Sequence, residues 1–393
     1  MQQLPLEDLL VIELASVLAG PAVGAFLAEL GATVIKVENL QGDVTRTWLL
    51  PEEKPKDGIS AYFSCVNWGK KSIALDLKYP EGKAILNELL QRADILITNF
   101  KPSSARRLGF AYEQIAHLYP HLIYGEITGY GNQEERVGYD AVLQAESGFM
   151  YLNSSPEGNP QKMPVALIDL IAAHHLKEGI LLALYNRQKT GLGTKVSCSL
   201  LHAAITALAN QATAVLFANY TPEPLGTEHP SIFPYGTLFY TQENKPILVA
   251  IGNDEQFSTF CQILQIPEIA QDPQFATNPR RVQNREILRP LLAEKIKLFH
   301  FDTLLYALHQ NQIPAGAVHT VNEALALPQV TPLLLHSPIG KGLKTIAFET
   351  PLLANTDLPP PPKLGEHTQE ILQEWLFYEE STFLKLKNKG IIQ

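Results

Sequence analysis

The sequence predicts an α/β protein, with a large domain built on a parallel sheet and a smaller α+β domain. Between residues 9 and 128, apolar runs typical of buried strands alternate with helical patterns, which is the order of a parallel sheet covered by helices. Residues 220–237 are rich in proline and glycine and indicate a linker, and residues 238–320 form a mixed hairpin-and-helix unit. The length of 393 residues also exceeds what one compact core usually holds.

The elements of the large domain follow one another in a regular order. The predicted strands cover residues 9–14, 33–38, 71–77, 94–100 and 122–128, and the predicted helices cover 19–31, 80–93 and 112–120. Pro21 suits a first helical turn and Gly31 suits a helix end. The strands have the length expected of buried parallel strands.

One carboxylate stands in an otherwise apolar stretch, MPVALIDLIAAHH at residues 163–175. It belongs to Asp169, which precedes a predicted helix over 171–188 that stops at the two glycines of KTGLG. Burying a lone charge costs free energy unless another group compensates it. Three interpretations are therefore open from the residues alone: a helix N-cap, the partner of a distant cation, or a reactive group.

The second half of the chain contains the smaller domain and a return to the larger one. Residues 238–252 predict a hairpin, helical patterns follow, and the return begins within 314–330. The proline run at 359–362 is stiff, and a helix is predicted after it. The predicted division is a large domain over 1–195, a linker helix and proline-rich connection over 196–230, a small domain over 231–325 and a C-terminal return over 326–393.

The composition argues against several classes of protein. Apolar residues make up 46% and charged residues 18%, as in ordinary soluble enzymes. No apolar run reaches the roughly 18–20 residues that span a bilayer, and the N-terminus has no secretory pattern, so no membrane contact is expected. The net charge of −9 disfavours nucleic-acid binding. Cys65, Cys198 and Cys261 lie far apart, which fits a cytoplasmic location and argues against structural zinc.

Dinucleotide and metal sites are not predicted either. Glu38 ends the second strand, where a ribose-binding acid would stand, but the first loop, ASVLAGPAVG, lacks the glycines of a GxGxxG fingerprint. His174 and His175 are neighbours on a predicted helix. Adjacent helical side chains point about 100° apart, so these two do not chelate one ion.

Basic residues gather at the ends of two predicted strands. Lys70, Lys71 and Lys78 flank the third strand, and Lys101, Arg106 and Arg107 follow the fourth. Ligands of parallel sheets bind beyond the carboxyl ends of the strands. A phosphate-bearing ligand is therefore one interpretation, and solvated surface charge is the other.

Blocks spread along the chain carry a resemblance to a known family. They are VIELASVLAGPAVGAFLAELGATVIKVENLQGDVTR, WGKKSIALDLKYPEGKAIL, ILITNFKPSSARRLGF, GYGNQEERVGYDAVLQAESG, MPVALIDL, VAIGNDEQFSTFCQIL, DPQFATNPRRVQNR, IPAGAV and PPPPKLGEHTQEIL. In this order they resemble the family III CoA-transferases, the CaiB/BaiF type, over essentially the whole chain. The resemblance implies a Rossmann-like sheet in the large domain and two ring-like chains interlocked as a homodimer.

The resemblance also implies an activity, the transfer of coenzyme A between an acyl-CoA and a small carboxylic acid. The family nucleophile is an aspartate in the block matched by VALIDL, which assigns the role to Asp169 and an aspartyl-CoA thioester to the mechanism. Apolar neighbours would desolvate this carboxylate, and a helix N-terminus would keep it ionised. Gly252 and Asn253, in IGNDEQF, match the family loop that faces the reacting group and are candidate oxyanion donors.

The same resemblance implies which residues contact coenzyme A, here a substrate and not a tightly bound cofactor. The matched positions are Val17 and Leu18 near the nucleotide, Leu75 and Lys78 beside the adenosine, Asn99, Phe100, Lys101 and Arg107 at the ADP moiety, and Tyr139 at the thioester. Arg107 is the expected phosphate partner. Two positions depart from the formyl-CoA transferases: Asn39 replaces an arginine, and Val137 replaces a lysine for which Arg136 is a candidate substitute.

Two alternative functions are open. The α-methylacyl-CoA racemases share the fold but place a histidine in a GHD motif, where this chain has Gly138-Tyr139-Asp140, and tyrosine is not a base near neutral pH. A non-catalytic CoA-binding paralogue is the other alternative, and the retained Asp169 argues against it. The IGNDEQF loop resembles members that use succinyl-CoA or other dicarboxylic donors more than formyl-CoA transferases, but the identity of the exchanged acids does not follow from it.

Overall fold

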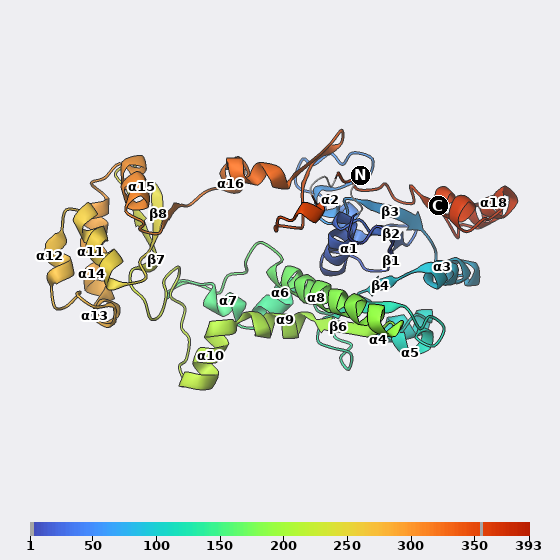
Figure 1. Ribbon diagram of the computed structural model, residues 1–393, viewed down its shortest axis with the longest axis horizontal. Helices are drawn as coiled ribbons and strands as arrows, with labels where there is room; N and C mark the ends of the chain where they lie inside the picture. Colours follow the sequence, from blue (N-terminus) through green and yellow to red (C-terminus); the bar gives the residue numbers. More distant parts are fainter. Residues whose placement is uncertain (1–3, 354–356) are drawn as a thin grey trace. The chain divides into compact units, whose positions relative to one another are not determined.

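The computed structural model describes residues 4–353 and 357–393, which form two compact units. The larger unit comprises Met1–Gly148, Met163–Phe217 and Pro332–Gln393, and the smaller unit comprises Phe149–Lys162 and Ala218–Thr331 (Figure 1). The chain leaves the larger unit twice and returns to it twice. The smaller unit is therefore assembled from two separate segments.

The larger unit is built on a six-stranded parallel sheet in the order β3-β2-β1-β4-β5-β6. Its strands are β1 (Leu10–Glu13), β2 (Thr33–Glu38), β3 (Lys70–Ala74), β4 (Ile95–Thr98), β5 (Ile123–Thr128) and β6 (Lys195–Ser199). β1 pairs with both β2 and β4, with Ile12 opposite Ile35 and Leu96. The predicted Rossmann-like sheet is confirmed, and its strand order reverses beside β1, where ligands of such sheets bind.

Helices cover both faces of this sheet because alternate strand residues point to opposite faces. On one face, Ile12, Ile35 and Leu96 pack against α3 (Pro80–Arg92) and the C-terminal elements η4 (Ile371–Trp375) and α18 (Glu380–Asn388). On the other face lie α1 (Ala19–Glu29) and α8 (Leu167–Thr190), which contact each other. There Gly125 of β5 lies against Ile180 of α8, so a methyl group at residue 125 would crowd the helix.

Shorter elements complete the larger unit. They are η1 (Val44–Thr47), α2 (Ala61–Ser64), α4 (Pro102–Leu108), α5 (Tyr112–Ile115), α6 (Asp140–Glu146), α9 (Leu200–Ala207), β10 (Leu334–Ser337), β11 (Gly340–Leu343), η3 (Pro351–Leu353) and α17 (Thr368–Glu370). α10 (Ala209–Ala218) and η2 (Pro328–Leu333) lie at the passages between the units. Over the described ranges, no single helix is long and apolar enough to cross a membrane; α9 and α10 reach that length only together, and they are bent by 71°.

Three elements differ from the sequence-based expectation. β6 is not predicted, because its alternating polar residues give no apolar run, and only its ladder with β5 establishes it. The helix predicted over 112–120 ends with α5 at Ile115, ahead of Pro120. α8 begins at Leu167, four residues earlier than predicted, so it includes Asp169, and it ends at Gly191 with φ of 73°.

The smaller unit combines one antiparallel sheet with helices. The sheet has the order β7-β8-β9, formed by β7 (Tyr235–Tyr240), β8 (Pro246–Ala250) and β9 (Ala315–Ala317), which includes the predicted hairpin. The helices are α7 (Phe149–Leu152), α11 (Asp254–Ile263), α12 (Pro267–Gln271), α13 (Asn278–Gln283), α14 (Arg285–Ile296), α15 (Phe301–Gln310) and α16 (Val321–Leu325). Its core is separate, with Phe239, Phe257, Leu288 and Leu304 in contact, so the predicted α+β character of this part is confirmed.

Candidate active site

The loop between β1 and α1 has an unusual backbone conformation. Val17 has φ of 73°, a left-handed conformation that costs a β-branched residue about 1–3 kcal/mol. The preceding Ser16 is held by Asn99, whose side-chain oxygen accepts the Ser16 N–H at 3.1 Å and whose amide donates to the Ser16 carbonyl at 2.8 Å. The end of β4 therefore clamps this loop through both polar atoms of one side chain.

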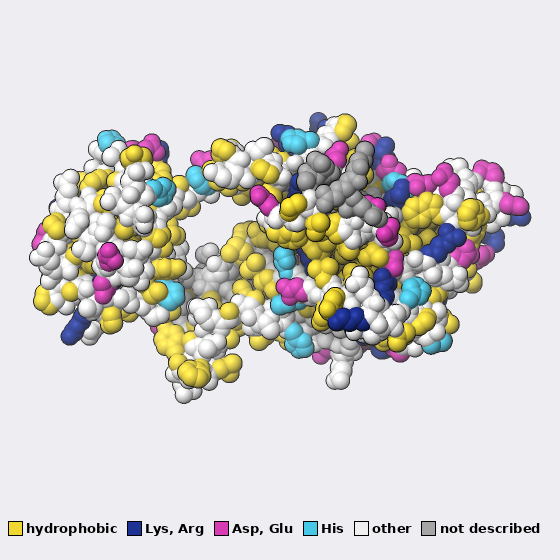
Figure 2. Space-filling model, in the orientation of Figure 1, with side chains coloured by type: hydrophobic (Ala, Val, Ile, Leu, Met, Phe, Trp, Pro, Cys, Tyr) yellow, Lys and Arg dark blue, Asp and Glu magenta, His cyan; other side chains and the backbone are white. Residues whose placement is uncertain are grey.

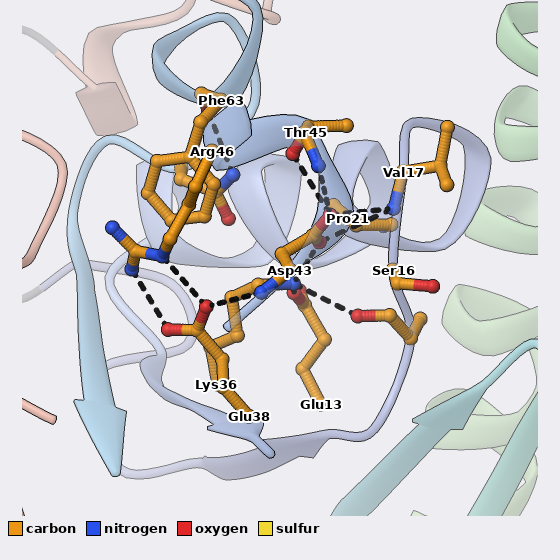
Figure 3. Close-up of polar contacts among 12 residues, drawn as sticks. Glu13, Ser16, Val17, Pro21, Lys36, Glu38, Asp43, Thr45, Arg46 and Phe63 are labelled. Atoms are coloured by element: carbon orange, nitrogen blue, oxygen red, sulfur yellow. Dashed lines mark hydrogen bonds and ion pairs between the residues drawn. The ribbon is translucent and has the colours of Figure 1, made fainter. Parts of the chain in front are cut away.

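Asp43 anchors the same loop from the end of β2 (Figure 3). Its two carboxylate oxygens share the Val17 N–H at 3.3 and 3.2 Å, and one of them lies 2.9 Å from the Lys36 ammonium. The N–H and hydroxyl of Thr45 also donate to Asp43, at 3.0 and 2.8 Å. Burial opposes ionisation of Asp43, but Lys36 and Thr45 outweigh it and hold the pKa of this carboxyl below its usual value.

Lys36 belongs to a buried cluster of alternating charges. Its ammonium lies 3.1 Å from one oxygen of Glu13, whose other oxygen lies 2.8 Å from the Lys70 ammonium, and all three side chains are at most 1% exposed. Burial lowers the pKa of Lys70 to about 8, against the attraction of Glu13. Burial acts on Lys36 in the same direction, but Glu13 and Asp43 outweigh it and its pKa is raised. Asp43 is thus attached to a rigid ionic cluster.

Glu38, the acid at the end of β2, is occupied by the protein itself. Arg46 donates to both of its oxygens at 2.8 Å, and the Asp43 N–H and the Ser72 hydroxyl donate at 2.9 and 2.6 Å. A dinucleotide-binding acid in this position uses its oxygens for ribose hydroxyls. Glu38 instead fixes the segment that carries Asp43, which agrees with the missing glycine fingerprint.

Two adjoining cavities open beyond the carboxyl ends of the central strands. The first has a volume of about 350 Å³ and includes Ser16, Lys36, Asp43, Leu75, Lys78 and Phe100 in its wall. The second has a volume of about 360 Å³ and includes Ser16, Val17, Asn99, Phe100, Lys101 and Tyr139. Ser16 and Phe100 line both, so the β1–α1 loop and the β4–α4 loop each contribute to the wall that the two spaces share.

The cavities bring together seven of the nine positions matched to coenzyme A contacts, namely Val17, Leu75, Lys78, Asn99, Phe100, Lys101 and Tyr139. Leu18 is buried at the start of α1 and lines neither of these two cavities. Arg107 also lines neither; it lies on α4, with a guanidinium nitrogen 3.5 Å from the Ser104 hydroxyl. Asn39 lines the first cavity, and its side-chain oxygen accepts the Gln41 N–H at 2.7 Å.

Asp169 lies inside helix α8 and does not cap it. The helix begins at Leu167 with Ala166 as N-cap, and the side chain of Asp140 accepts the Ile168 N–H at 2.7 Å. The N-cap interpretation of Asp169 is therefore wrong, because the side chain that accepts a backbone N–H at this helix start belongs to Asp140. Burial, followed by the charge of Asp140, raises the pKa of Asp169 to about 7. Asp169 is a desolvated carboxyl, only 8% exposed, that ionises near neutral pH.

Gln144 holds Asp140 in place one turn along α6. Its amide nitrogen donates to Asp140 at 2.7 Å, and its amide oxygen accepts the Met163 N–H at 2.8 Å. Gln144 is 1% exposed and Asp140 is 8% exposed. These hydrogen bonds tie the segment that leads into α8 to helix α6. They therefore fix where α8 starts and where Asp169 lies.

An aromatic pair near Asp169 is not singled out by the sequence. The rings of Trp48 and Tyr62 meet edge to face with centroids 5.0 Å apart. Burial, followed by the charges of Cys65, Asp169 and Asp140, raises the pKa of Tyr62 to about 12. The phenol therefore keeps its proton within electrostatic reach of Asp169. No local pattern marks Tyr62, because it lies more than a hundred positions before Asp169 in the chain.

Tyr139 and Arg136 both lie in the wall of the second cavity. Tyr139 is the N-cap residue of α6, is 53% exposed, and stands where the racemase motif has histidine. Arg136 lines the same cavity, but its guanidinium donates to Glu146 at 2.9 and 3.1 Å and stacks on the Tyr130 ring at 3.8 Å. Val137 stands where the formyl-CoA transferases have a lysine. Arg136 would have to leave its ion pair with Glu146 to take the place of that lysine.

The predicted substrate loop lies in the smaller unit, between β8 and α11. Asn253 is the N-cap of α11 and accepts the Gln256 N–H at 2.8 Å, while the Gly252 N–H donates to the Gln256 side chain at 2.8 Å. The next residue, Asp254, lies 2.7 Å from the fully buried guanidinium of Arg281. The loop is thus ordered by its own helix, and the Gly252 N–H is engaged within it.

Histidine, cysteine, aspartate and glutamate are the side chains that could bind a metal ion in the described part of the chain. No group of three or more His, Cys, Asp and Glu side chains there could hold a metal ion. His174 and His175 are exposed on α8, and His175 lies 3.5 Å from Glu178.

Several known proteins are similar to this chain over nearly its whole length. The sequence profile of CoA-transferase family III matches residues 6–368. A succinate–glutarate CoA-transferase of Agrobacterium fabrum is 38% identical over 386 residues, 94% of this chain and 95% of that protein. The human succinyl-CoA:glutarate CoA-transferase is 35% identical over 398 residues, 99% of this chain and 90% of that protein. The crystal structure of a CaiB/BaiF family protein from Brucella suis matches with a TM-score of 0.84 and 38% identity, covering 95% of this chain and 100% of that one.

Proposed function

This chain belongs to CoA-transferase family III, and we propose that it moves coenzyme A from an acyl-CoA to a carboxylic acid through a covalent thioester on Asp169. The observation that carries the proposal is the buried carboxyl of Asp169 near the N-terminus of α8, with its pKa raised to about 7. The two cavities of the same unit support it, because they gather most of the positions matched to coenzyme A.

The transfer consists of four acyl substitutions. The Asp169 carboxylate attacks the thioester carbon of the donor, which forms a mixed anhydride and releases the coenzyme A thiolate. The thiolate attacks the Asp169 carbonyl of the anhydride, which releases the donor acid and leaves an aspartyl-CoA thioester. The acceptor carboxylate then attacks this thioester and forms a second anhydride and free thiolate. Attack of the thiolate on the acceptor carbonyl gives the new acyl-CoA and restores the Asp169 carboxylate.

The environment of Asp169 suits a carboxylate nucleophile. Burial removes water that would otherwise stabilise the anion and block its attack, so the ionised form is reactive. The N-terminus of α8 favours the negative charge by about 0.3–1 kcal/mol. Each addition also creates an oxyanion, which needs a donor in a site that excludes water. The protonated phenol of Tyr62 is one candidate donor.

Dicarboxylic acids are the proposed acyl groups. The two relatives named above are described as acting on succinate or succinyl-CoA and on glutarate. A panel of acyl-CoA donors with mono- and dicarboxylic acceptors tests this, with succinyl-CoA and glutarate as the first pair. Selective exchange between monocarboxylic acids would contradict the proposed substrate class while leaving the transferase activity intact.

Trapping experiments test the covalent intermediate. Incubation with an acyl-CoA and hydroxylamine should convert Asp169 to its hydroxamate, which peptide mass spectrometry locates, and Asp169→Asn should give no adduct. Full acyl exchange by Asp169→Ala would overturn the nucleophile assignment. Washout of α-deuterium from an acyl-CoA without acyl exchange would indicate racemase chemistry. Failure of the wild type to bind coenzyme A would contradict both the transferase and the racemase function.

We also propose that the protein works as a homodimer. The adjacent residues Leu216 and Phe217 on α10 have side chains that are 84% and 88% exposed, and Figure 2 shows hydrophobic side chains over α10. Monomers rarely leave such side chains together in water. Sedimentation of the wild type should give a dimer that Leu216→Lys with Phe217→Lys weakens; a monomeric wild type contradicts the proposal.

A cytoplasmic location without nucleic-acid or membrane partners completes the proposal. Its support is the free state of Cys65, Cys198 and Cys261 and the net charge of −9, which fit a reducing compartment and disfavour polyanions. Cell fractionation tests the location, since recovery in the membrane fraction would contradict it.

A further inference from the structure

We propose that Asp43 is a positioning residue of the acyl-CoA site, which holds Val17 in its left-handed conformation and so sets the wall between the two cavities. The inference rests on the proposed function, because it takes these cavities as the place of the acyl-CoA. Asp43 lines the first cavity, and Val17 lines the second. Asp43 touches the loop and not the reacting atoms, so it acts through Val17.

The strained backbone of Val17 is the observation behind the proposal. A φ of 73° is common for glycine but unfavourable for valine, whose branched side chain crowds the backbone there. Such outliers persist only where the surroundings hold them, and they concentrate at functional sites. At Val17 the holding contact is the backbone N–H, which points between the two carboxylate oxygens of Asp43 at 3.3 and 3.2 Å.

Asp43 is itself immobile enough to hold a strained residue. The Lys36 ammonium lies 2.9 Å from its carboxylate, and the Asp43 N–H donates to Glu38 at 2.9 Å. Lys36 is in turn paired with Glu13 in the buried ionic cluster, and Glu38 is fixed by Arg46 (Figure 3). The side chain is only 1% exposed, so water does not compete for these bonds. A charge-assisted bond in such a setting is stronger than a neutral one.

The consequence is a loop that is preorganised for its ligand. Val17 and Ser16 line the second cavity, so a change at the peptide before Val17 moves that wall. A ligand that meets a fixed wall loses less free energy in ordering the protein on binding. An asparagine at position 43 has nearly the same shape, but its NH₂ group replaces either the oxygen that faces the Lys36 ammonium or the one that faces the Thr45 N–H. In both orientations two donors face each other, and only one oxygen remains to accept the Val17 N–H. The hold on Val17 is therefore weakened.

The test is a double-mutant cycle between Asp43→Asn and Val17→Gly, read by calorimetric titration with coenzyme A and by KM for succinyl-CoA. Asp43→Asn should weaken coenzyme A binding about tenfold and raise KM by a similar factor, with a smaller change in kcat. Glycine adopts a φ of 73° without strain. In the Val17→Gly background, the loss caused by Asp43→Asn should therefore fall to about threefold or less.

A matched control separates this effect from the general loss of a buried acid. Glu29 is also a buried carboxylate that accepts two backbone N–H groups, those of Thr345 and Ile346, and it lines neither cavity. Glu29→Gln should leave coenzyme A affinity within about twofold of wild type. Unchanged affinity in Asp43→Asn, or an equal loss in both backgrounds, would overturn the proposal.

Hydrogen exchange of the wild type tests the same contact without any substitution. The Val17 amide should exchange as slowly as the amides of β1, although it lies in a loop. Exchange at the rate of an open loop would overturn the role of Asp43 even if Asp43→Asn does not fold. If wild-type protein does not bind coenzyme A, the proposed function itself has failed, which calorimetry distinguishes from failure of the Asp43 contact alone.

Discussion

The carboxylate of Asp140 accepts the Ile168 N–H at 2.7 Å and so caps helix α8 one residue before Asp169. Two buried acids thus stand at one helix N-terminus with different environments. Asp140 is bonded to Ile168 and to Gln144, while burial and the charge of Asp140 raise the pKa of Asp169 to about 7. Two carboxyl groups that lie in different environments often take different chemical roles.

Replacing Asp169 should abolish transfer and stabilise the fold. Asp169→Asn removes the nucleophile, so the rate of succinyl-CoA:glutarate exchange should fall at least about 1,000-fold. The folded protein binds the Asp169 proton more tightly than the unfolded chain does, so wild-type stability falls as pH rises from about 4 through 7. The neutral amide escapes this loss, and unfolding by urea at pH 8 should show a gain on the order of 2–4 kcal/mol. Equal stability of the two proteins at pH 8 would contradict the inference that the Asp169 carboxylate is desolvated in the folded protein.

The pH dependence of kcat/KM should report the ionisation of Asp169. Activity should rise with pH through an apparent pKa of about 7, because only the carboxylate attacks the thioester. Asp140→Asn removes a negative neighbour, so the rising limb should move toward lower pH. A limb that stays in place would show that Asp140 does not act on Asp169 through its charge.

Removing the amide of Gln144 should loosen the start of α8. Gln144→Leu removes the hydrogen bonds that the Gln144 amide makes with the Asp140 carboxylate and with the Met163 N–H, which should lower the free energy of unfolding by about 1–3 kcal/mol. The start of α8 should shift, so kcat should fall more than the affinity for coenzyme A. Gln369→Leu on the exposed side of α17 is the control and should stay within about 0.5 kcal/mol of wild type. A loss of coenzyme A affinity at unchanged kcat would instead assign Gln144 to the cavities.

Lys78 should serve the nucleotide end of coenzyme A. It lines the first cavity beside Leu75, and the loss of one phosphate-directed cation there should raise KM for succinyl-CoA by about 5–10-fold in Lys78→Ala. KM for succinyl-pantetheine, which lacks the nucleotide, should not change. Lys385 has an exposed side chain on α18, and Lys385→Ala should alter neither KM value. An equal rise in KM for both thioesters would place Lys78 at the acyl end.

The parallel sheet could be predicted because its signals are local. Apolar runs such as residues 9–14 and 33–38 indicate buried strands, and helical patterns separate these runs. β6 is not predicted for the opposite reason: three of its five residues are polar, and its partner β5 lies about seventy positions earlier. α8 was placed correctly along its length, but its start was not, because the cap that begins it comes from Asp140 on α6.

The sequence by itself determined the sheet class of the larger unit and, through its family blocks, the candidate nucleophile Asp169 and seven residues of the cavity walls. The tertiary structure decided how these residues are held. Asp43 meets Val17 across 26 positions, Asp140 meets Ile168 across 28, and Asn99 meets Ser16 across 83. Periodicity reports only which face of an element is buried, so it cannot pair residues from different elements. The contacts of Asp43 and Asn99 depend on the parallel sheet, which brings the ends of distant strands to one edge, and the contact of Asp140 depends on the packing of α6 against α8.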